Sequence, residues 1–379
     1  DARTGELVWT FRTIPEPGDY GYESWLDEGI EFTGNTGVWA PISGDPELGH
    51  VYLPVESATG DRFGGDRPGD NLFSDSIVAL DIKTGERQWH YQLTHHDIWD
   101  WDIPAAPVIS DLPNGQKVLM SVTKQSWIYT FDRATGEPIW PIEERPVPAG
   151  DVPGEWYSTT QPFPTNPPPF DRQGFTEEDL IDWTPEIRAL AFEATKGFRL
   201  APSVYSPPSL ADAEDGTRGT LSLPNETGGA NWEGAAVDPE TGTIYVPSRT
   251  ALAVMSLGKD EDSDLDFSAA FGVRVPRVQG LEIVKPPYGR ITAIDMNTGK
   301  HLWMIANADT PDRIKNHRLL EGIEIERTGI PTRAGVLVTK SLLFVGEGTG
   351  GPGASPIFRA VDKATGDILA EIDLPNNQS

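Results

Sequence analysis

The feature that most constrains the fold is a five-residue motif, Asp-x-x-Thr-Gly, which occurs six times along the chain. In four copies a Trp follows the Gly by four residues, whereas the fourth copy continues Thr-Ile-Tyr-Val and the sixth has Ala370 at the Trp position. The copies begin at Asp1, Asp81, Asp132, Asp238, Asp295 and Asp362. A motif that recurs at intervals of tens of residues indicates a fold assembled from similar units.

Each copy predicts a strand, a tight turn and a second strand. Apolar runs precede several copies, as in residues 76–80 and 290–294. The Asp accepts hydrogen bonds from turn amides, and the Gly supplies the positive φ that a hairpin turn requires. A Trp at a fixed offset then wedges between neighbouring units. We therefore expect an all-β chain of the β-propeller type with about six blades; the alternative is a set of unrelated hairpins in a sandwich.

The segments between the units are polar and rich in Pro. Residues 145–215 form the largest insertion, with an extended Pro-rich stretch over 161–169. A helix is expected after it, with Thr184 as the N-cap, Pro185 in the first helical position and Gly197 closing the segment. We expect this insertion to cover one face of the propeller, as a lid or as a contact with a neighbour.

Composition excludes several classes of function. The net charge of −28 argues against nucleic-acid binding, because the phosphates would be repelled. The absence of Cys excludes disulfides, thiolate metal sites and cysteine nucleophiles in this chain. No apolar run approaches the roughly 18 residues of a membrane helix.

Three familiar chemistries fit the sequence poorly. The run Gly346–Gly351 satisfies Gly-x-Gly-x-x-Gly after an apolar strand at 342–345, but Pro352 blocks the helix that a dinucleotide site needs. No Gly-x-Ser-x-Gly elbow accompanies the two adjacent His residues, which disfavours a serine hydrolase. His95, His96 and Asp97 are contiguous and cannot all face one zinc ion from a regular element.

The stretch 94–104, Thr-His-His-Asp-Ile-Trp-Asp-Trp-Asp-Ile-Pro, is the densest cluster of reactive side chains. Carboxylates and imidazoles beside indoles are costly to bury without partners, so the stretch is a solvated loop or a site. Other segments offer matching groups. Asn35 supplies an oxygen suited to a hard cation, Trp39 and Trp232 supply flat faces, and Lys124 supplies a charge. Taken singly, each Trp has the alternative of core packing and each Asn that of a turn residue.

Together these motifs resemble the pyrroloquinoline quinone (PQQ) quinoprotein dehydrogenases. The motifs are the Asp-Thr-Gly-Trp repeats, Thr33-Gly-Asn35-x-x-x-Trp39, His95-His96-Asp97-x-Trp99-Asp100 and Gly228-Gly-Ala-Asn231-Trp232. The resemblance covers nearly the whole chain. Lys124 and the lack of adjacent cysteines point to the membrane glucose dehydrogenase-like branch, which favours sugars or cyclic polyols over simple alcohols.

The resemblance implies a role for each site residue. Trp39 would stack on the quinone, and Asn231 with Trp232 would line its edge. Asn35 and Asp100 would bind Ca²⁺ or Mg²⁺, and Asp100 would act as the general base. Lys124 would hydrogen-bond the quinone oxygens. His95, His96 and Asp97 would shape the substrate mouth, while Asp102, Trp99 and Trp101 would orient or pack the loop.

The resemblance also implies the setting of the protein. The family propeller has eight blades, so residues 1–379 are expected to be one propeller domain with an incomplete set of blades, truncated at both ends. The implied partners are a sugar or polyol substrate and a quinone or cytochrome electron acceptor, in the bacterial periplasm, with any membrane association through segments absent here. The alternative function is a non-catalytic propeller scaffold of the outer-membrane assembly type.

Overall fold

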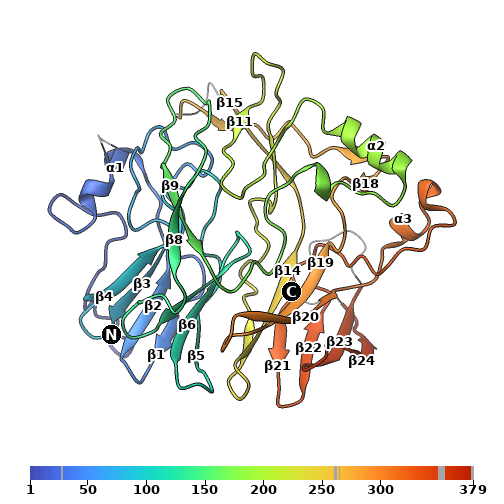
Figure 1. Cartoon of the computed structure of the whole chain (residues 1–379). Coiled ribbons are helices and arrows are strands. Elements are labelled where there is room, and N and C mark those ends of the chain that lie inside the picture. Colours follow the sequence, from blue (N-terminus) through green and yellow to red (C-terminus); the bar gives the residue numbers. More distant parts are fainter. Residues whose placement is uncertain (27–28, 260–262, 264, 349–354, 377–379) are drawn as a thin grey trace.

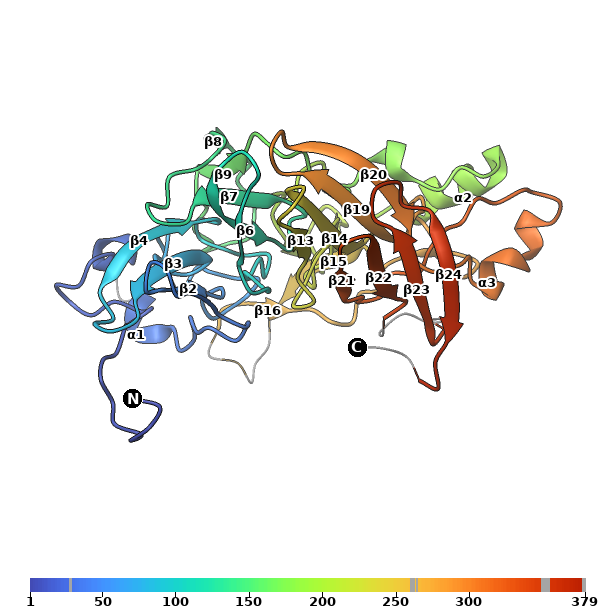
Figure 2. The ribbon, with the colours of Figure 1, turned by 90° about the horizontal axis from the view of Figure 1, so that it is seen from below.

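The computed structural model describes residues 1–26, 29–259, 263, 265–348 and 355–376. Strands dominate these residues, as expected, and four sheets succeed one another along the chain (Figures 1 and 2). The first sheet contains β1 (Ser43–Asp45), β2 (His50–Pro54), β3 (Ser76–Asp81) and β4 (Arg87–Gln92). The second contains β5 (Val108–Asp111), β6 (Lys117–Val122) and β7 (Ile128–Asp132). The third contains β13 (Ala236–Asp238), β14 (Thr243–Arg249), β19 (Gly289–Asp295) and β20 (Lys300–Ala306). The fourth contains β21 (Val336–Val338), β22 (Leu342–Gly346), β23 (Ile357–Asp362) and β24 (Ile368–Asp373).

All four sheets are antiparallel and their strands are ordered by sequence. Their first strands touch in series, because β1 contacts β5, β5 contacts β13 and β13 contacts β21. The buried faces between sheets are built from β-branched and aromatic residues, such as Ile244 and Val246 against Val118 and Met120. In a propeller, successive sheets pack face to face and their first strands lie next to one another, which is the arrangement seen here.

The repeats form the turns of these sheets, although not one turn per sheet. The copies at Asp81, Asp295 and Asp362 join the third and fourth strands of their sheets. The copy at Asp132 follows β7 and leads to Pro138, which forms a bridge with Phe131 where a fourth strand would start. The copy at Asp238 joins β13 to β14 in the same sheet as Asp295, and no strand forms over residues 1–12. The described residues therefore contain four propeller-type sheets rather than the expected six or so.

The expected Trp wedge is present between consecutive units. The indole Nε1 of Trp9 donates to the carbonyl oxygen of Ile82 at 3.1 Å, and that of Trp89 donates to Arg133 at 3.2 Å. A Cβ added at Gly136 would lie 2.5 Å from the Trp89 ring, so the turn glycine is the surface on which the indole rests. Trp303 repeats the arrangement on the carbonyl of Lys363, at 3.2 Å.

Trp140 departs from this pattern. The site equivalent to Gly136 in the next sheet is Gly299, and it is covered by the side chain of Asn166, whose Nδ2 donates to Thr298. Trp140 instead packs at the edge of the core between the second and third sheets. The large insertion therefore takes over a contact that Trp makes elsewhere.

Tyrosines and ion pairs strengthen two of these junctions. Tyr52 and Tyr245, on β2 and β14, donate to the same carbonyl oxygens as the Trp residues, those of Arg133 and Lys363. The Arg133 side chain forms an ion pair with buried Asp45 at 2.7 Å, and Lys363 contacts Asp238 at 2.5 Å. Both acids begin the turn between the first and second strands of the preceding sheet.

The insertions lie above the four sheets in the view of Figure 1. Residues between β7 and β13 supply β8 (Ile142–Pro146), β9 (Thr160–Pro164), β10 (Arg199–Leu200), β11 (Ser209–Leu210) and β12 (Thr220–Ser222). Residues between β14 and β19 supply β15 (Ala253–Gly258), β16 (Ser268–Ala269), β17 (Arg277–Val278) and β18 (Leu281–Glu282). Because β15 pairs with both β11 and β12, the two insertions share one sheet.

The expected helix in the insertion is α2 (Pro185–Ala194). Thr184 caps it, accepting a hydrogen bond from the Ile187 amide at 3.1 Å, and Pro185 takes the first helical position. The other helices are α1 (Gly29–Phe32) and α3 (Asp312–Lys315), with 3₁₀ turns at Tyr22–Ser24, Glu177–Asp179 and Arg318–Leu320. Among the described residues, no helix is both long enough and apolar enough to cross a membrane. Residues 349–354 of the Gly-rich run lie outside the described residues.

Candidate active site

The loop 94–104 lies between β4 and β5, on the side of the sheets that faces the insertions. Its two indoles are buried, as expected for packing residues, and they tie the loop to the insertion. Trp99 donates to the carbonyl of Ser206 at 2.8 Å, and Trp101 donates to Val204 at 3.3 Å. Two side chains of the turn between β6 and β7 meet the loop from the second sheet: Lys124 contacts Asp100, and Gln125 donates from Nε2 to Thr94 Oγ1 at 2.9 Å.

Lys124 and two aspartates of the loop form the polar centre of the site. Its Nζ lies 2.8 Å from the carbonyl oxygen of Asp100, 2.8 Å from Asp100 Oδ1 and 3.1 Å from Asp102 Oδ2. These three acceptors use the three hydrogens of the ammonium group. The predicted pair of catalytic residues, Asp100 and Lys124, is therefore brought into direct contact.

The two carboxylates have unequal surroundings. Asp102 also accepts hydrogen bonds from the Ser57 amide at 2.8 Å, from Ser57 Oγ at 2.7 Å and from Trp39 Nε1 at 3.2 Å. Asp100 has Lys124 as its side-chain partner, and its side chain is 24% exposed, against 13% for Asp102. Asp100 is thus the more accessible of the two and the less supported in its charged form.

This inequality separates the proton affinities of the two groups. Burial raises the pKa of Asp100 to about 8, with Asp102 adding to the rise and Lys124 opposing it. Burial also acts on Asp102, but Lys124 and the Ser57 hydrogen bonds outweigh it and leave its pKa below the usual value. The pKa of Lys124 is raised, because the two carboxylates outweigh the cost of its burial. Two neighbouring acids with divergent pKa values are typical of acid–base sites.

The edge of the Trp39 indole contacts the polar centre formed by Lys124, Asp100 and Asp102. Its Nε1 is fixed on Asp102, while 46% of the residue is exposed. The indole is therefore held in place with a free surface beside Lys124, which suits a stacking platform better than core packing.

Asn35 lies close by, on a segment paired with residues 56–59. The Asn35 carbonyl accepts from the Thr59 amide at 3.2 Å, and the Gly37 amide donates to Glu56 Oε1 at 2.7 Å. Burial raises the pKa of Glu56 and that of the nearby Asp61, and in both cases Asp102 contributes to the rise. Asn35, Glu56 and Asp61 thus place additional oxygen atoms on the same side as Asp102.

A preformed cage of three acidic or imidazole ligands is absent from the described part of the chain. A cation would instead draw on mixed oxygens, such as the Asn35 amide and the Asp100 carboxylate. The second of these is already engaged by Lys124.

The loop with Asn231 and Trp232 reaches the site from the third sheet. The Gly229 amide donates to the Lys124 carbonyl at 2.8 Å, and a Cβ at Gly228 would lie 2.6 Å from Lys124 Cα. Only glycine permits this approach of the two loops. Asn231 is buried and forms a local turn, with Nδ2 donating to Thr227 and Oδ1 accepting from the Trp232 amide. Trp232 is 40% exposed.

The residues predicted for the substrate mouth belong to the same loop, but their side chains contact groups other than Lys124. His95 Nε2 is 3.0 Å from Glu144 on β8, and His96 is buried against Glu155 at 3.1 Å. Asp97 is buried, and its carboxylate accepts the amides of Trp99 and Trp101 at 3.0 and 2.6 Å. All three thus join the loop to its support, and their part in substrate binding stays a prediction.

Sequence reasoning missed the supporting residues. Asp102 was expected only to orient the loop, yet it joins Lys124, Trp39 and Ser57. Arg67 is buried under the loop and donates to Asn71 Oδ1 and to the carbonyls of Thr59, Gly60 and Asp97. Only the fold brings these segments together, and a lone Arg-Pro-Gly-Asp-Asn run in the sequence carries no such signal.

The sheets and the site together define a propeller with a lysine-linked pair of aspartates and exposed indoles. The family model described as "Glucose/ethanol/alcohol dehydrogenase, beta-propeller domain", of the PQQ type, matches residues 1–379. The chain belongs to this family of PQQ-dependent dehydrogenases, which confirms both the predicted fold and the resemblance.

Relatives of known name agree with this assignment. The quinate/shikimate dehydrogenase (quinone) of Acinetobacter baylyi is 31% identical over 80% of this chain and 40% of its own length. The glycerol dehydrogenase large subunit of Gluconobacter oxydans is 31% identical over 99% of this chain and 53% of its own. Quinoprotein glucose dehydrogenase A of Acinetobacter calcoaceticus is 29% identical, over 99% and 48%. The chain thus spans about half the length of these relatives.

A solved structure supports the fold. A europium-containing methanol dehydrogenase superposes with a TM-score of 0.60, at 22% identity, over 96% of this chain and 51% of that protein. At this identity the likeness shows the shared architecture and no shared substrate.

Proposed function

We propose that this chain forms the PQQ-binding site of a dehydrogenase that oxidises a hydroxyl group of a sugar or polyol. The observation that carries the proposal is the contrast between Asp100 and Asp102 on one lysine. Asp102 is held as an anion by four donors, whereas burial raises the pKa of the more exposed Asp100 to about 8. A carboxyl group with this pKa holds a proton at neutral pH and is suited to accept one from a substrate hydroxyl once the pH reaches about 8, where a large share of it is ionised.

The residues around this pair fit a flat, anionic cofactor. Trp39 and Trp232 would pack on the ring system, with Trp39 fixed at its edge by Asp102. PQQ, when bound, supplies the acceptor for the hydride of the substrate carbon. Asp100 would take the hydroxyl proton, and Lys124 would stabilise negative charge beside it. Because the ammonium hydrogens of Lys124 are already engaged, a quinone oxygen would have to replace one aspartate acceptor.

The cation and the partners are further parts of the proposal. Ca²⁺ or Mg²⁺ would bind at Asn35 and Asp100, where Glu56 and Asp61 add oxygen atoms. The relatives named for glucose, glycerol and quinate support a sugar or polyol substrate. A quinone or cytochrome acceptor and a periplasmic location complete the proposal. A non-catalytic scaffold would not require two neighbouring aspartates whose pKa values are shifted in opposite directions, which argues against the alternative function.

Binding and turnover test the proposal separately. PQQ titrated into the chain with Ca²⁺ should quench Trp fluorescence, and Asp100→Asn should bind PQQ with near-normal affinity. With PQQ and Ca²⁺ bound to the full-length protein, dye reduction with glucose, glycerol and quinate should reveal the substrate, and Asp100→Asn should lower kcat by at least about 100-fold. Near-normal turnover by Asp100→Asn would refute the general base, and absence of PQQ binding to the full-length protein would refute the function.

A further inference from the structure

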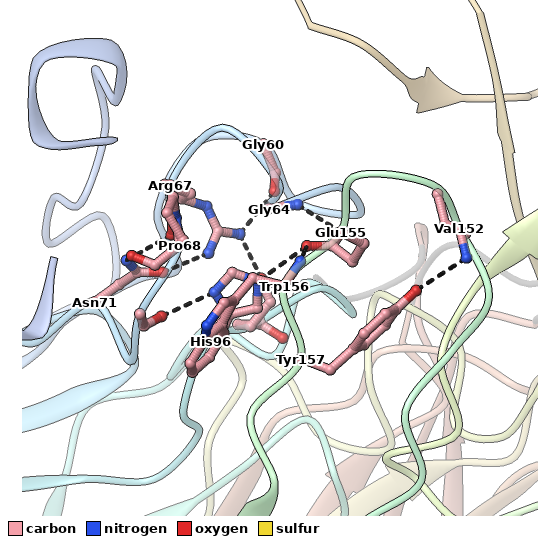
Figure 3. Close-up of polar contacts among 12 residues, drawn as sticks. Gly60, Gly64, Arg67, Pro68, Asn71, His96, Val152, Glu155, Trp156 and Tyr157 are labelled. Carbon is pink, nitrogen blue, oxygen red and sulfur yellow. Dashed lines mark hydrogen bonds and ion pairs between the residues drawn. The ribbon is translucent and has the colours of Figure 1, made fainter. Parts of the chain in front are cut away.

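His96 and Asp97 are adjacent in the sequence, and together they link the large insertion to the loop that carries Asp100. His96 makes the contact with the insertion, at Glu155 (Figure 3). Asp97 makes the contacts within the loop, including one with the Trp101 amide. Neither side chain touches Lys124 in the structure. The role of this connection is therefore separate from the chemistry proposed for Asp100 itself.

On the insertion side, the contact between His96 and Glu155 is buried, and both ring nitrogens of His96 have a hydrogen-bond partner. His96 Nε2 lies 3.1 Å from Glu155 Oε1 and Nδ1 lies 2.9 Å from the Gly69 carbonyl, with the Trp156 ring 4.7 Å away edge-on. The side chains of His96 and Glu155 are each 1% exposed. Glu155 also accepts the amides of Gly64 at 2.8 Å and Trp156 at 2.9 Å.

This geometry requires one proton between the two side chains. The Gly69 carbonyl can only accept, so Nδ1 carries a hydrogen, and Nε2 then faces a carboxyl oxygen. Two bare acceptors at this distance would repel each other, so either Nε2 or Glu155 is protonated. Burial and then Arg67 lower the pKa of His96, and the Glu155 hydrogen bond acts against them. The other ionisable groups facing the pair are Asp66 and Tyr157.

On the loop side, Asp97 controls the backbone around Asp100. Its carboxylate accepts the amides of Trp99 and Trp101, which flank Asp100 on either side. Asp100 itself has a φ of +63°, a conformation that non-glycine residues adopt only when their surroundings hold it. The Arg67 guanidinium donates to the Asp97 carbonyl and so fixes the Asp97–Ile98 peptide, at the start of the turn that the Asp97 carboxylate holds.

We infer that Glu155 is a positioning residue for Asp100, which acts through His96 and the Asp97 turn, and that the contact depends on one shared proton. The inference rests on the proposed function of Asp100. The insertion has a second hold on the same loop, because the Gln161 side chain exchanges hydrogen bonds with the backbone of His95 at 2.8 and 2.6 Å. Through these two holds the insertion determines where the catalytic carboxylate sits.

Hydrogen exchange of the Trp99 and Trp101 amides tests this directly, because it needs neither cofactor nor turnover. Glu155→Ala should speed exchange at both amides by about tenfold, the effect of losing one buried hydrogen bond. Glu155→Gln should restore slow exchange, since its amide can donate to Nε2 of a neutral His96. Glu144→Ala is the matched control, because Glu144 makes the same kind of contact with His95 but is 50% exposed; it should leave both amides unchanged.

The pH dependence separates positioning from simple packing. In the unaltered chain, protection of the two amides, corrected for intrinsic exchange, should fall as the pH rises through the pKa of His96, which burial places below the usual histidine value. Glu155→Gln should abolish this dependence, because its donor hydrogen does not titrate. If Glu155→Ala unfolds the chain, this comparison still decides the question.

Two results would overturn the inference. One is unchanged exchange at Trp99 and Trp101 in Glu155→Ala, and the other is the same pH profile in Glu155→Gln as in the unaltered chain. In the PQQ-loaded full-length protein, Glu155→Ala should also lower kcat about tenfold with little change in KM. A failure of the turnover arm alone, with the exchange results as expected, would count against the proposed function and leave the positioning intact.

Discussion

Lys124 contacts two different parts of Asp100, its backbone carbonyl and its carboxylate, each at 2.8 Å from Nζ. One ammonium group therefore fixes both the position of the loop and the direction of the side chain. This double contact explains how Asp100 keeps a left-handed backbone, with φ of +63°, in a loop that has no regular structure.

Replacing Lys124 tests the energetic role of this contact. Lys124→Met should lower the free energy of unfolding by about 3 kcal/mol at neutral pH, because it leaves the charged and largely buried Asp102 without its cation. Urea unfolding followed by circular dichroism measures the change. The double variant Lys124→Met/Asp102→Asn should recover part of the loss, and a stable single variant would show that the charges are not paired in solution.

Trp39 should contribute to cofactor binding through its face. Trp39→Ala should weaken PQQ binding about tenfold, and Trp39→Phe only about threefold, since a phenyl ring keeps the aromatic surface but loses the hydrogen bond to Asp102. Equilibrium titration of PQQ, followed by the absorbance of the cofactor, measures both. If both variants bound PQQ with the same affinity as the unaltered chain, the cofactor would have to lie away from Trp39.

The turn glycines allow the junction between sheets to be tested with a matched pair. Gly136 and Gly115 have φ values of +75° and +87°, so Ala is strained at either position. Only Gly136 lies against an indole, that of Trp89, whereas the space around Gly115 is open. Gly115→Ala should cost about 1 kcal/mol, and Gly136→Ala roughly 3 kcal/mol, because Trp89 must also move. Equal losses in thermal unfolding would contradict the docking role of Trp89.

The ion pair between Asp238 and Lys363 should make the last junction acid-sensitive. Burial tends to raise the pKa of Asp238, but hydrogen bonds from Lys363 and Thr241 outweigh it and lower the pKa. Stability from a depressed carboxyl pKa is present above the unfolded value and is lost as pH falls through the folded value. Asp238→Asn should therefore cost about 1–2 kcal/mol at pH 7 and progressively less below about pH 4.

A double-mutant cycle provides the control for this prediction. Lys363→Met and Asp238→Asn should each remove the same pH-dependent stability, and their combination should cost little more than either alone. Additive losses would mean that the two side chains act independently.

The fold was predictable where local chemistry determines it. Asp81 accepts the amides of Lys83 and Thr84, and Gly85 has a φ of +72°, as the motif requires. The cap of α2 at Thr184 follows equally from local rules. The number of sheets did not follow, because the same turn also joins β13 to β14, within the sheet that contains Asp295.

The contact between two of the predicted residues followed from the sequence, whereas the connections that support them did not. Asp100 and Lys124 were expected from their motifs, and the structure brings them together. Glu155 and Arg67 gave no signal, because their roles depend on segments that meet only in the folded chain. The burial of His96 was equally hidden, since a histidine next to another in a polar run is usually solvated.

The docking Trp residues recognise main-chain carbonyls, those of Ile82, Arg133 and Lys363, rather than side chains. The residue that supplies the carbonyl is aliphatic at one junction and basic at the other two, and in each case the carbonyl accepts the same hydrogen bond from a Trp. A unit that binds its neighbour in this way requires from it a turn glycine and a free carbonyl, whatever side chain accompanies that carbonyl, so it can be duplicated, exchanged or allowed to diverge with few compensating changes in the next unit. This independence offers a route by which a gene could lengthen by repeating one blade, and a principle for building chimeric propellers from blades of distant relatives.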